Sequence, residues 1–376
     1  ETQAPVAAAA SSGPGRRVAV PVLYGRAAEL HLLEELLAAL SAGAGGGLIV
    51  RAAAGMGKSS LLRYLLDIAE QRGVLAFGSR SYEAENKLPS QSLAEMSAQM
   101  AAGADAPGGL EESFHLADFI SRFATQRPIV LGFDDLYLAD EVTLQLVHRL
   151  FRLAQRHAIL LVATFRPWEG SQSRAFLQLL TSLRREGFMR ELTLGPLDAA
   201  TTRLVAGQQF EPEAVDAELL DDIAGEAGGN PFFAAELARS AIASGRASRA
   251  GGTWRLTSPT PIPVPRTVRD VFDRALERLA PLAADMLRVV AVAGADFDMA
   301  LLSSILQAPE EQLVEALEQL MAAGLMAETQ GAYVLGHSLL RRIVFERLTP
   351  PRRQLLLRRV AEAVAQRGAA EGQEKV

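Results

Sequence analysis

One short segment restricts the fold of this chain more than any other. Residues Ala52–Ser59 read Ala-Ala-Ala-Gly-Met-Gly-Lys-Ser, directly after the expected strand Leu48–Arg51, and helical periodicity begins at Lys58. A buried strand, a tight turn with exposed amides and a helix N-terminus together form a binding loop for phosphate groups. Gly55 and Gly57 allow backbone amides to approach phosphate oxygens closely. The segment therefore predicts a phosphate-binding loop at the end of a strand.

Each residue type in this loop has an expected task. Lys58 would reach the terminal phosphates as a point charge, and the Ser59 hydroxyl would ligate Mg²⁺. The full pattern begins with glycine, where this chain has Ala52, but the Gly-Lys-Ser core is intact. The alternative is a chance helix cap, although one of only three lysines in the chain falls at the required position. The residues expected to bind phosphate here are Ala54, Gly55, Met56, Gly57, Lys58, Ser59 and Ser60.

The first half of the chain alternates wholly apolar short runs with helical patterns. Runs that are apolar throughout are typical of parallel strands buried on both faces. We therefore expect an α/β fold: a parallel sheet of the P-loop NTPase type with helices on both faces. The expected strands are Leu48–Val50, Val74–Gly78, Pro128–Phe133, Ala158–Thr164 and Arg190–Leu194.

Two carboxylates follow one of these wholly apolar strands. Asp134 and Asp135 come directly after the run that ends at Phe133. Because parallel strands present ligands at their carboxyl ends, Asp134 would face Mg²⁺ at the loop, directly or through water. Asp135 would orient or activate a water aimed at the γ-phosphate. The side chain of Asp135 is shorter than the glutamate that vigorous ATPases often use at this position, which predicts slow hydrolysis. The alternative is that the pair caps the helix near Ala139.

Composition excludes several classes of protein. The chain has no cysteine, so disulfide frameworks and thiolate metal sites are excluded. A net charge of −6 argues against a general binder of nucleic acid or membrane surfaces. No apolar run reaches the roughly 18 residues that span a bilayer, and no secretion signal is visible, so we expect a cytoplasmic protein. The chain does not begin with methionine, and we interpret it as a processed or excised piece of a longer protein.

Five segments are expected along the chain. After Pro196 the strand signal ends and short helical patterns begin; Pro281–Leu348 then reads as three helices, a hairpin and a helix, as in a winged helix. The expected segments are a linker or disordered tail (1–21), a P-loop nucleotide-binding domain (22–196), a helical lid with linker (197–265), a winged-helix domain (266–350) and a C-terminal helix and tail (351–376).

Four further residues carry weaker signals. Arg166 follows a strand and could stabilise a γ-phosphate, although a surface arginine is the simpler interpretation. Asn230 and Pro231 have the types preferred at a helix start. His337 is isolated, and a lone histidine is more often structural. The helix in the recognition position, Pro309–Ala323, carries four glutamates and no lysine or arginine, so we expect it not to contact DNA.

Taken in order, these segments resemble the STAND class of P-loop NTPases, and most closely the large ATP-binding LuxR-type bacterial transcriptional regulators. The resemblance extends from Val22 to Ala365. The matching blocks are Gly25-Arg26-Ala27-Ala28-Glu29-Leu30, the phosphate loop, Asp134-Asp135-Leu136-Tyr137-Leu138-Ala139-Asp140, Thr164-Phe165-Arg166-Pro167, Gly228-Gly229-Asn230-Pro231-Phe232-Phe233 and His337-Ser338-Leu339-Leu340-Arg341-Arg342. The family usually has His-Trp or Gln-Trp where Tyr137-Leu138 stand here.

The resemblance implies roles for residues outside the loop. It implies that Arg26 lies beside the adenine, that Arg166 senses the γ-phosphate, and that Pro231 belongs to a lid over the nucleotide. It further implies that His337 touches the ADP β-phosphate from a winged helix and holds an inactive state. In that motif Gly336 and Ser338 stand where relatives have Met and Asp.

The leading hypothesis is therefore an ATP/ADP-binding switch with Mg²⁺ and slow ATPase activity. In the ADP state it would be a closed monomer, and ATP, favoured by an inducer or protein partner, would permit self-association. DNA would be bound only through a domain absent from this chain. The alternatives are an oligomeric AAA+ motor or initiator-type ATPase, for which Arg184 or Arg185 could act in trans, and a nucleotide-binding scaffold that does not hydrolyse.

Overall fold

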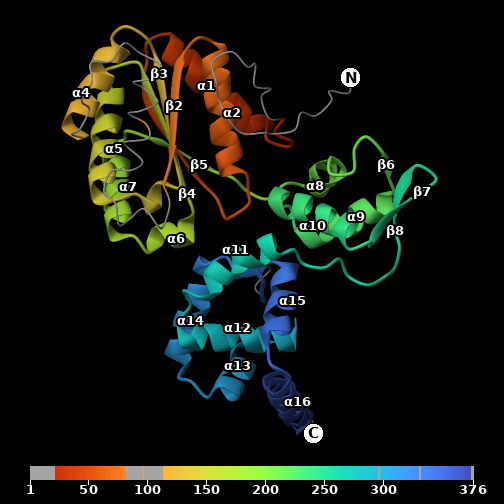
Figure 1. Ribbon diagram of the computed structural model, residues 1–376. Coiled ribbons are helices and arrows are strands. Elements are labelled where there is room, and N and C mark those ends of the chain that lie inside the picture. Colours follow the sequence, from red (N-terminus) through yellow and green to blue (C-terminus); the bar gives the residue numbers. More distant parts are fainter. Residues whose placement is uncertain (1–21, 82–95, 97–112, 295–296, 330–331, 374–376) are drawn as a thin grey trace. The chain divides into compact units, whose positions relative to one another are not determined.

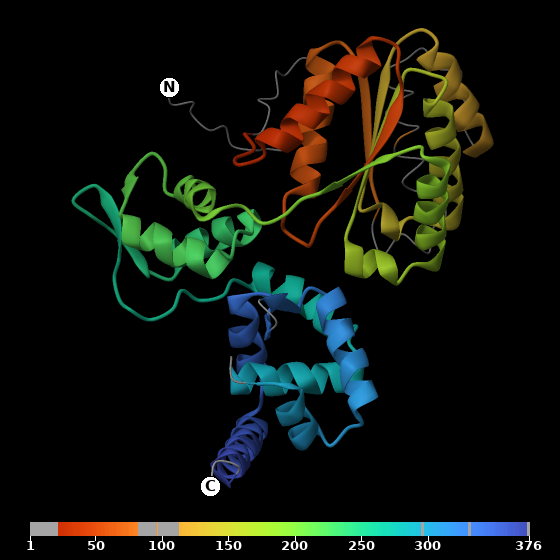
Figure 2. The same ribbon diagram turned by 180° about the vertical axis from the view of Figure 1, so that it is seen from behind.

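The chain folds as two compact units, residues 1–195 and 196–376, which are described separately (Figures 1 and 2). The computed structural model describes residues 22–81, 96, 113–294, 297–329 and 332–373. The tail expected over 1–21 lies outside these residues, as does the helix expected around Gln91–Met100 apart from Met96. Within the described ranges, no helix combines the length and apolar character needed to cross a bilayer.

The first unit is built on a five-stranded sheet with the order β2-β3-β4-β1-β5. Every neighbouring pair of strands is parallel, which confirms the expected parallel α/β sheet. The strands are β1 (Gly46–Arg51), β2 (Leu75–Arg80), β3 (Ile129–Asp134), β4 (Ile159–Phe165) and β5 (Arg190–Thr193). β2 extends two residues beyond the expected end at Gly78, because Arg80 pairs in register with Asp134 of β3.

Helices cover both faces of this sheet, as Figures 1 and 2 show from opposite sides. On one face lie α1 (Ala27–Ser41) and α2 (Lys58–Gln71), and on the other lie α4 (Ser113–Ala124), α5 (Glu141–Ala154) and α7 (Arg174–Glu186). All residues of β3 and β4 are buried as a result. Two strand glycines let α2 pack closely: a Cβ at Gly78 would come within 2.8 Å of Leu66, and one at Gly132 within 2.9 Å of Leu62. The short helices η2 (Leu136–Leu138) and α6 (Pro167–Ser171) follow β3 and β4.

The second unit begins with α8 (Ala199–Gly207), α9 (Ala217–Ala227) and α10 (Pro231–Ala243), followed later by α11 (Arg266–Leu276). β7 (Ala247–Ala250) pairs antiparallel with β8 (Thr253–Leu256) to form a hairpin. A two-residue strand, β6 (Ala214–Val215), adds to β8 in parallel. Sequence patterning gave no sign of β6, since two residues carry no periodicity.

The rest of the second unit has the expected order of elements. α12 (Pro281–Ala293), α13 (Met299–Leu306) and α14 (Glu310–Ala322) precede a hairpin of β9 (Met326–Thr329) and β10 (Ala332–Leu335). Two helices follow, α15 (Ser338–Arg347) and α16 (Pro350–Gln373). On α16, Leu356 is buried, whereas Leu357 and Val364 are about half exposed.

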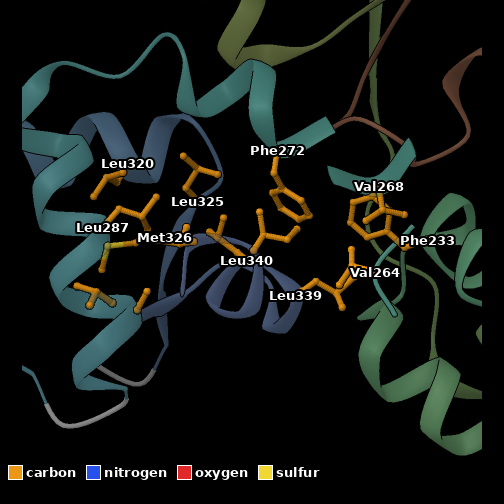
Figure 3. Close-up of a cluster of buried hydrophobic side chains, with 14 of the residues drawn as sticks. Phe233, Val264, Val268, Phe272, Leu287, Leu320, Leu325, Met326, Leu339 and Leu340 are labelled. Atoms are coloured by element: carbon orange, nitrogen blue, oxygen red, sulfur yellow. The ribbon is translucent and has the colours of Figure 1, made fainter. Parts of the chain in front are cut away.

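One hydrophobic core runs through the whole second unit. Figure 3 shows part of it: Phe233 of α10 lies beside Val268 and Phe272 of α11, while Leu339 and Leu340 of α15 lie between these and the α12 and α14 side chains. The ring of Phe233 lies 5.0 Å from that of His337 and 5.4 Å from that of Phe272. The helices that precede and follow the segment 248–265 are thus stabilised by a shared core.

Candidate functional site

The carboxyl ends of three adjacent strands bring the predicted site residues of the first unit to one edge of the sheet. The phosphate loop follows β1, Arg166 follows β4, and Asp134 and Asp135 end and follow β3. Since β4 pairs with both β1 and β3, these segments lie side by side. With the loop and the carboxylates at opposite ends of the sheet, the expected site could not form. The observed strand order excludes that alternative.

Lys58 is the first residue of α2 and is buried. Its Nζ donates hydrogen bonds to the carbonyl oxygens of Ala52 (2.7 Å) and Ala53 (2.9 Å). Burial, followed by the nearby charge of Arg166, lowers the pKa of Lys58 to about 8, against the opposing effect of Asp135 and other carboxylates. An anion at the loop would favour the charged ammonium, because an opposite charge within a few ångströms raises the pKa of an amine.

The loop itself has the backbone that its glycines predict. Gly55 and Gly57 have φ values of 80° and 93°, which side chains with a Cβ rarely adopt. Gly57 is the N-cap of α2, so the first amides of that helix have no intrahelical partner and can bind an anion. Ser59 is partly buried and Ser60 is exposed. Ser60 was expected at the site on sequence position alone, and its role stays a prediction.

Asp134 is held by a buried threonine from the neighbouring strand. Thr164 Oγ1 donates to Asp134 Oδ1 at 2.6 Å and accepts from the backbone N–H of Asp135 at 2.9 Å. Thr164 is completely buried. The hydroxyl therefore fixes one oxygen of the first carboxylate and the backbone of the second, which gives the pair a defined orientation.

Asp135 is buried between two arginines. Its Oδ1 lies 3.6 Å from Arg166 Nε, and its Oδ2 lies 3.5 Å from Arg80 Nη2. Asp135 has φ 52° and ψ 43°, a left-handed conformation tolerated best by Asn, Asp and Gly. Asp140, rather than Asp134 or Asp135, caps α5 by accepting from the N–H of Thr143. The helix-cap alternative for the aspartate pair is therefore wrong.

Arg166 is a partly buried member of the same cluster. Its Nη1 also pairs with Glu169 Oε1 at 3.4 Å, within the first turn of α6. Burial opposes the charge of Arg166, but Tyr137, Asp135 and Glu169 outweigh it and raise the pKa of Arg166 above its usual value. This guanidinium is charged at all ordinary pH values and is directed at the edge where Asp135 lies. The interpretation of Arg166 as an unattached surface arginine is wrong.

Arg26 lies against the phosphate loop. Its Nη2 donates to the carbonyl oxygens of Met56 (3.2 Å) and Gly195 (2.8 Å), and its Nη1 pairs with Glu29 at 3.0 Å. Arg26 is buried. The residue therefore joins the loop to the last residue of the first unit; its expected position beside an adenine stays a prediction.

Pro231 and His337 belong to the second unit, and their expected contacts with a nucleotide stay predictions. Pro231 is the first residue of α10, with Asn230 accepting from the N–H groups of Phe232 and Phe233. The His337 Nδ1 accepts from Leu339 N–H (3.1 Å), so Nε2 carries the proton donated to Ala227 O (2.9 Å). Both ring nitrogens are thus occupied within the unit, and burial lowers the pKa of His337.

The site can be tested for its fit to Mg²⁺ by the chemistry of its donors. Asp134 supplies carboxylate oxygens and Ser59 a hydroxyl, and such hard oxygen donors suit Mg²⁺. Among the described residues, no three His, Asp or Glu side chains form a metal-binding group. These residues fit a cation that takes its remaining ligands from phosphate and water, as Mg²⁺ does at nucleotide sites.

Sequence reasoning did not single out Arg80, Thr164 or Glu169. Arg80 and Thr164 each lie on a strand next to β3, where register decides the partner. Parallel strands present functional side chains at their carboxyl ends, and applying this rule to every strand could have identified Arg80. Glu169 follows Arg166 at the i, i+3 spacing of a helical pair, which is a readable signal once α6 is known.

Comparisons with known proteins bear on the fold of the chain. Residues 22–162 match the family model of the AAA ATPase domain. An uncharacterized protein of Rhizobium meliloti (strain 1021) is 26% identical over 402 residues, a match that covers 93% of this chain. The chain spans 38% of the length of that relative.

Two solved structures share the fold. A Walker-type ATPase of Pyrococcus abyssi has a TM-score of 0.58 at 14% identity, covering 86% of this chain and 96% of that one. The ORC2 protein of Aeropyrum pernix, solved as ADPNP-ADP complexes, has a TM-score of 0.60 at 14% identity, covering 92% and 96%. Together with the family match over residues 22–162, they support a P-loop NTPase fold for the first unit.

Proposed function

We propose that this chain binds ATP and ADP with Mg²⁺ in the first unit and acts as a slow, nucleotide-gated switch of the STAND class. The observation that supports this most strongly is the convergence of Lys58, Asp134, Asp135 and Arg166 at one sheet edge. Lys58 and the α2 amides would hold the phosphates, with Ser59 and Asp134 as ligands of Mg²⁺. A bound Mg²⁺ would neutralise charge on the phosphate oxygens.

Slow turnover follows from the surroundings of Asp135. A general base needs a carboxylate oxygen available to the proton that it removes. Here both oxygens of Asp135 face guanidinium groups, those of Arg166 and Arg80. Asp135 can orient a water only after one of these ion pairs opens, and this step would precede hydrolysis.

Arg26 connects the loop to the end of the first unit. Its guanidinium bonds the carbonyls of Met56 in the loop and of Gly195, the residue directly before the second unit. A shift of the loop on nucleotide binding would therefore act on the segment that leads into α8. Switching of this kind requires that each nucleotide bind two arrangements with different affinity.

For the second unit we propose a helical lid followed by a winged helix, made by α12–α15 with the β9–β10 hairpin. On this proposal α14 is the recognition-position helix, and its Glu310, Glu311, Glu315 and Glu318 are all exposed. Phosphate backbones would be repelled by this face. DNA binding would therefore belong to a part of a longer LuxR-type regulator outside this chain, and His337 would secure the inactive arrangement.

An oligomeric initiator-type or motor ATPase is the second candidate. The fold likeness to the ORC2 protein of Aeropyrum pernix extends over 92% of this chain, which favours it. Such an enzyme would use an arginine supplied by a neighbouring copy, and its turnover would rise with protein concentration. The acidic surface of α14 speaks against DNA contact through that helix.

The rate of ATP turnover and the mass of the assembly in solution distinguish the switch from the motor ATPase. For the switch we expect purified protein to release ADP on denaturation, to turn over well below about one ATP per second, and to self-associate with a non-hydrolysable ATP analogue.

Asp135→Asn should prolong the lifetime of bound ATP, whereas Asp118→Asn, at an exposed ion pair with Arg149, should not. Turnover above about one per second that rises steeply with concentration would favour the motor. An unchanged ATP lifetime in Asp135→Asn would favour a scaffold that does not hydrolyse.

The lowered pKa of Lys58 predicts how nucleotide affinity depends on pH. The pKa is about 8 without a phosphate, and a bound polyphosphate would raise it. Nucleotide affinity is therefore fully present below pH 8. Above pH 8 it falls by up to about tenfold per pH unit, until the pH reaches the pKa that Lys58 has with the nucleotide bound. Titrations from pH 7.5 to 10 measure this, in a range where the phosphates stay ionised. A flat profile would show that Lys58 does not contact the phosphates.

A further inference from the structure

Glu169 is a second carboxylate that contacts Arg166, from within the first turn of α6. Its Oε1 lies 3.4 Å from Arg166 Nη1. Asp135 approaches another nitrogen of the same guanidinium, with Oδ1 3.6 Å from Nε. The arginine therefore has a carboxylate beside two of its three side-chain nitrogens, and the two carboxylates come from different segments of the chain.

The packing of α6 keeps Glu169 in place. The backbone N–H of Gly170 donates to Arg166 O at 2.8 Å, which closes the turn that holds both side chains. A Cβ at Gly170 would lie 3.0 Å from Phe165 and 3.1 Å from Phe176, so the helix packs closely on these two rings. The Glu169 side chain is only 19% exposed. Its carboxylate is thus kept near Arg166 by a packed turn.

The contacts of Arg166 leave room for a further acceptor. Charge-assisted N–H···O bonds are usually about 2.7–2.9 Å long, whereas both carboxylate contacts of this guanidinium are 3.4 Å or longer. Its buried Nε has no hydrogen-bond partner among the described residues. Arg166 is therefore held by two carboxylates but not saturated by them, and it can still donate to an anion at the loop.

Glu169 and Arg166 also share an electrostatic environment with Lys58. Burial lowers the pKa of Lys58 most, the charge of Arg166 lowers it further, and the carboxylates of Asp135 and Glu169 oppose this effect. A further negative charge beside these groups would be attracted by the two cations and repelled by Glu169. The charge of Glu169 therefore acts most strongly on a ligand whose own charge lies close to Arg166.

We propose that Glu169 sets the balance between ATP and ADP, as a positioning residue that occupies Arg166 when no γ-phosphate is present. This inference rests on the proposed nucleotide function and names a residue that determines which nucleotide its site prefers. Both nucleotides gain alike from Lys58 and the loop amides. Only ATP carries a phosphate that competes with Glu169 for the guanidinium and that is repelled by its charge. Glu169 thus shifts the site toward ADP.

The ratio of two dissociation constants tests this proposal. The affinities for ADP and for a non-hydrolysable ATP analogue are measured by calorimetry with excess Mg²⁺ on variants of the full chain. Glu169→Gln removes the negative charge and keeps the shape of the side chain. It should shift the ratio toward the ATP analogue by roughly threefold to tenfold, the range expected for a partly exposed ion pair. Glu169→Asp keeps the charge and should shift the ratio less.

Glu186→Gln is the matched control. Glu186 is a similarly exposed glutamate at the end of α7, and its carboxylate pairs with His148, outside the site. Its ratio should equal that of the wild-type chain. If Glu169 only stabilised the start of α6, Glu169→Gln would weaken both nucleotides alike. An unchanged ratio, or one shifted toward ADP, would overturn the role of Glu169 alone. If the wild-type chain binds neither nucleotide, the proposed function fails, and this inference fails with it.

Discussion

Replacing Lys58 by alanine should abolish measurable nucleotide binding. The ammonium is buried and held at the loop by two carbonyl oxygens, at 2.7 and 2.9 Å from Nζ. A charge-assisted contact in such a place is worth about 3–5 kcal/mol when one partner is removed, or more than a hundredfold in affinity. Calorimetric titration with ADP and with a non-hydrolysable ATP analogue measures the loss.

The matched control is Arg63→Ala. Arg63 lies on the same helix, α2, and is exposed, so its loss removes a positive charge near the loop without touching the carbonyls of Ala52 and Ala53. Affinity in this variant should stay within about twofold of the wild-type value, as expected for a screened surface charge. Because Lys58 is not part of the apolar core, circular dichroism of Lys58→Ala should match the wild-type chain. Nucleotide affinity unchanged by Lys58→Ala would refute the assignment of the loop.

The fold of the first unit could be predicted because local and global signals agree there. Runs that are apolar at every position, such as Ile129–Phe133 and Ile159–Ala163, are typical of strands buried on both faces, and this favours a parallel sheet between helices. The carboxyl-end rule then places Asp134 and the loop at one edge. No side-chain contact is needed for either step.

The remainder of the site depends on register, which local sequence does not encode. The polar residues Ser79 and Arg80 look like the start of a loop, yet pairing with β3 keeps them in the sheet and sets Arg80 beside Asp134. Thr164 lies in a wholly apolar run and gives no signal of its own. Its function appears only when β4 is set beside β3, where its hydroxyl meets the carboxylate.

Prediction in the second unit was limited for a related reason. The patterns of the individual helices were readable, whereas the shared core from α8 to α16 depends on how those helices pack. His337 illustrates the difference. The residue pattern favoured a structural histidine, whereas the resemblance implied a phosphate contact. The structure shows its ring nitrogens bonded to Ala227 and Leu339 inside the unit. A role toward a nucleotide would require this pair of bonds to open.

The last prediction concerns Thr164, whose replacement by valine removes a hydroxyl while keeping the branched shape. The N–H of Asp135 and Oδ1 of Asp134 would both lose their partner at a completely buried position. A buried polar group left unsatisfied costs about 1–3 kcal/mol. We therefore expect the free energy of unfolding of the first unit to fall by roughly 2–4 kcal/mol, and the affinity for Mg²⁺-nucleotide to fall with it because Asp134 loses its fixed orientation.

The two tryptophans of the chain allow this to be measured one unit at a time, since Trp168 lies in the first unit and Trp254 in the second. In a Trp254→Phe background, Trp168 fluorescence reports urea unfolding of the first unit alone. Thr164→Ser keeps the hydroxyl and removes one methyl group, so it should cost about 1 kcal/mol and retain Mg²⁺-nucleotide binding. Equal losses in the serine and valine variants would show that packing of the methyl group, and not the hydroxyl contact with Asp134, accounts for the effect.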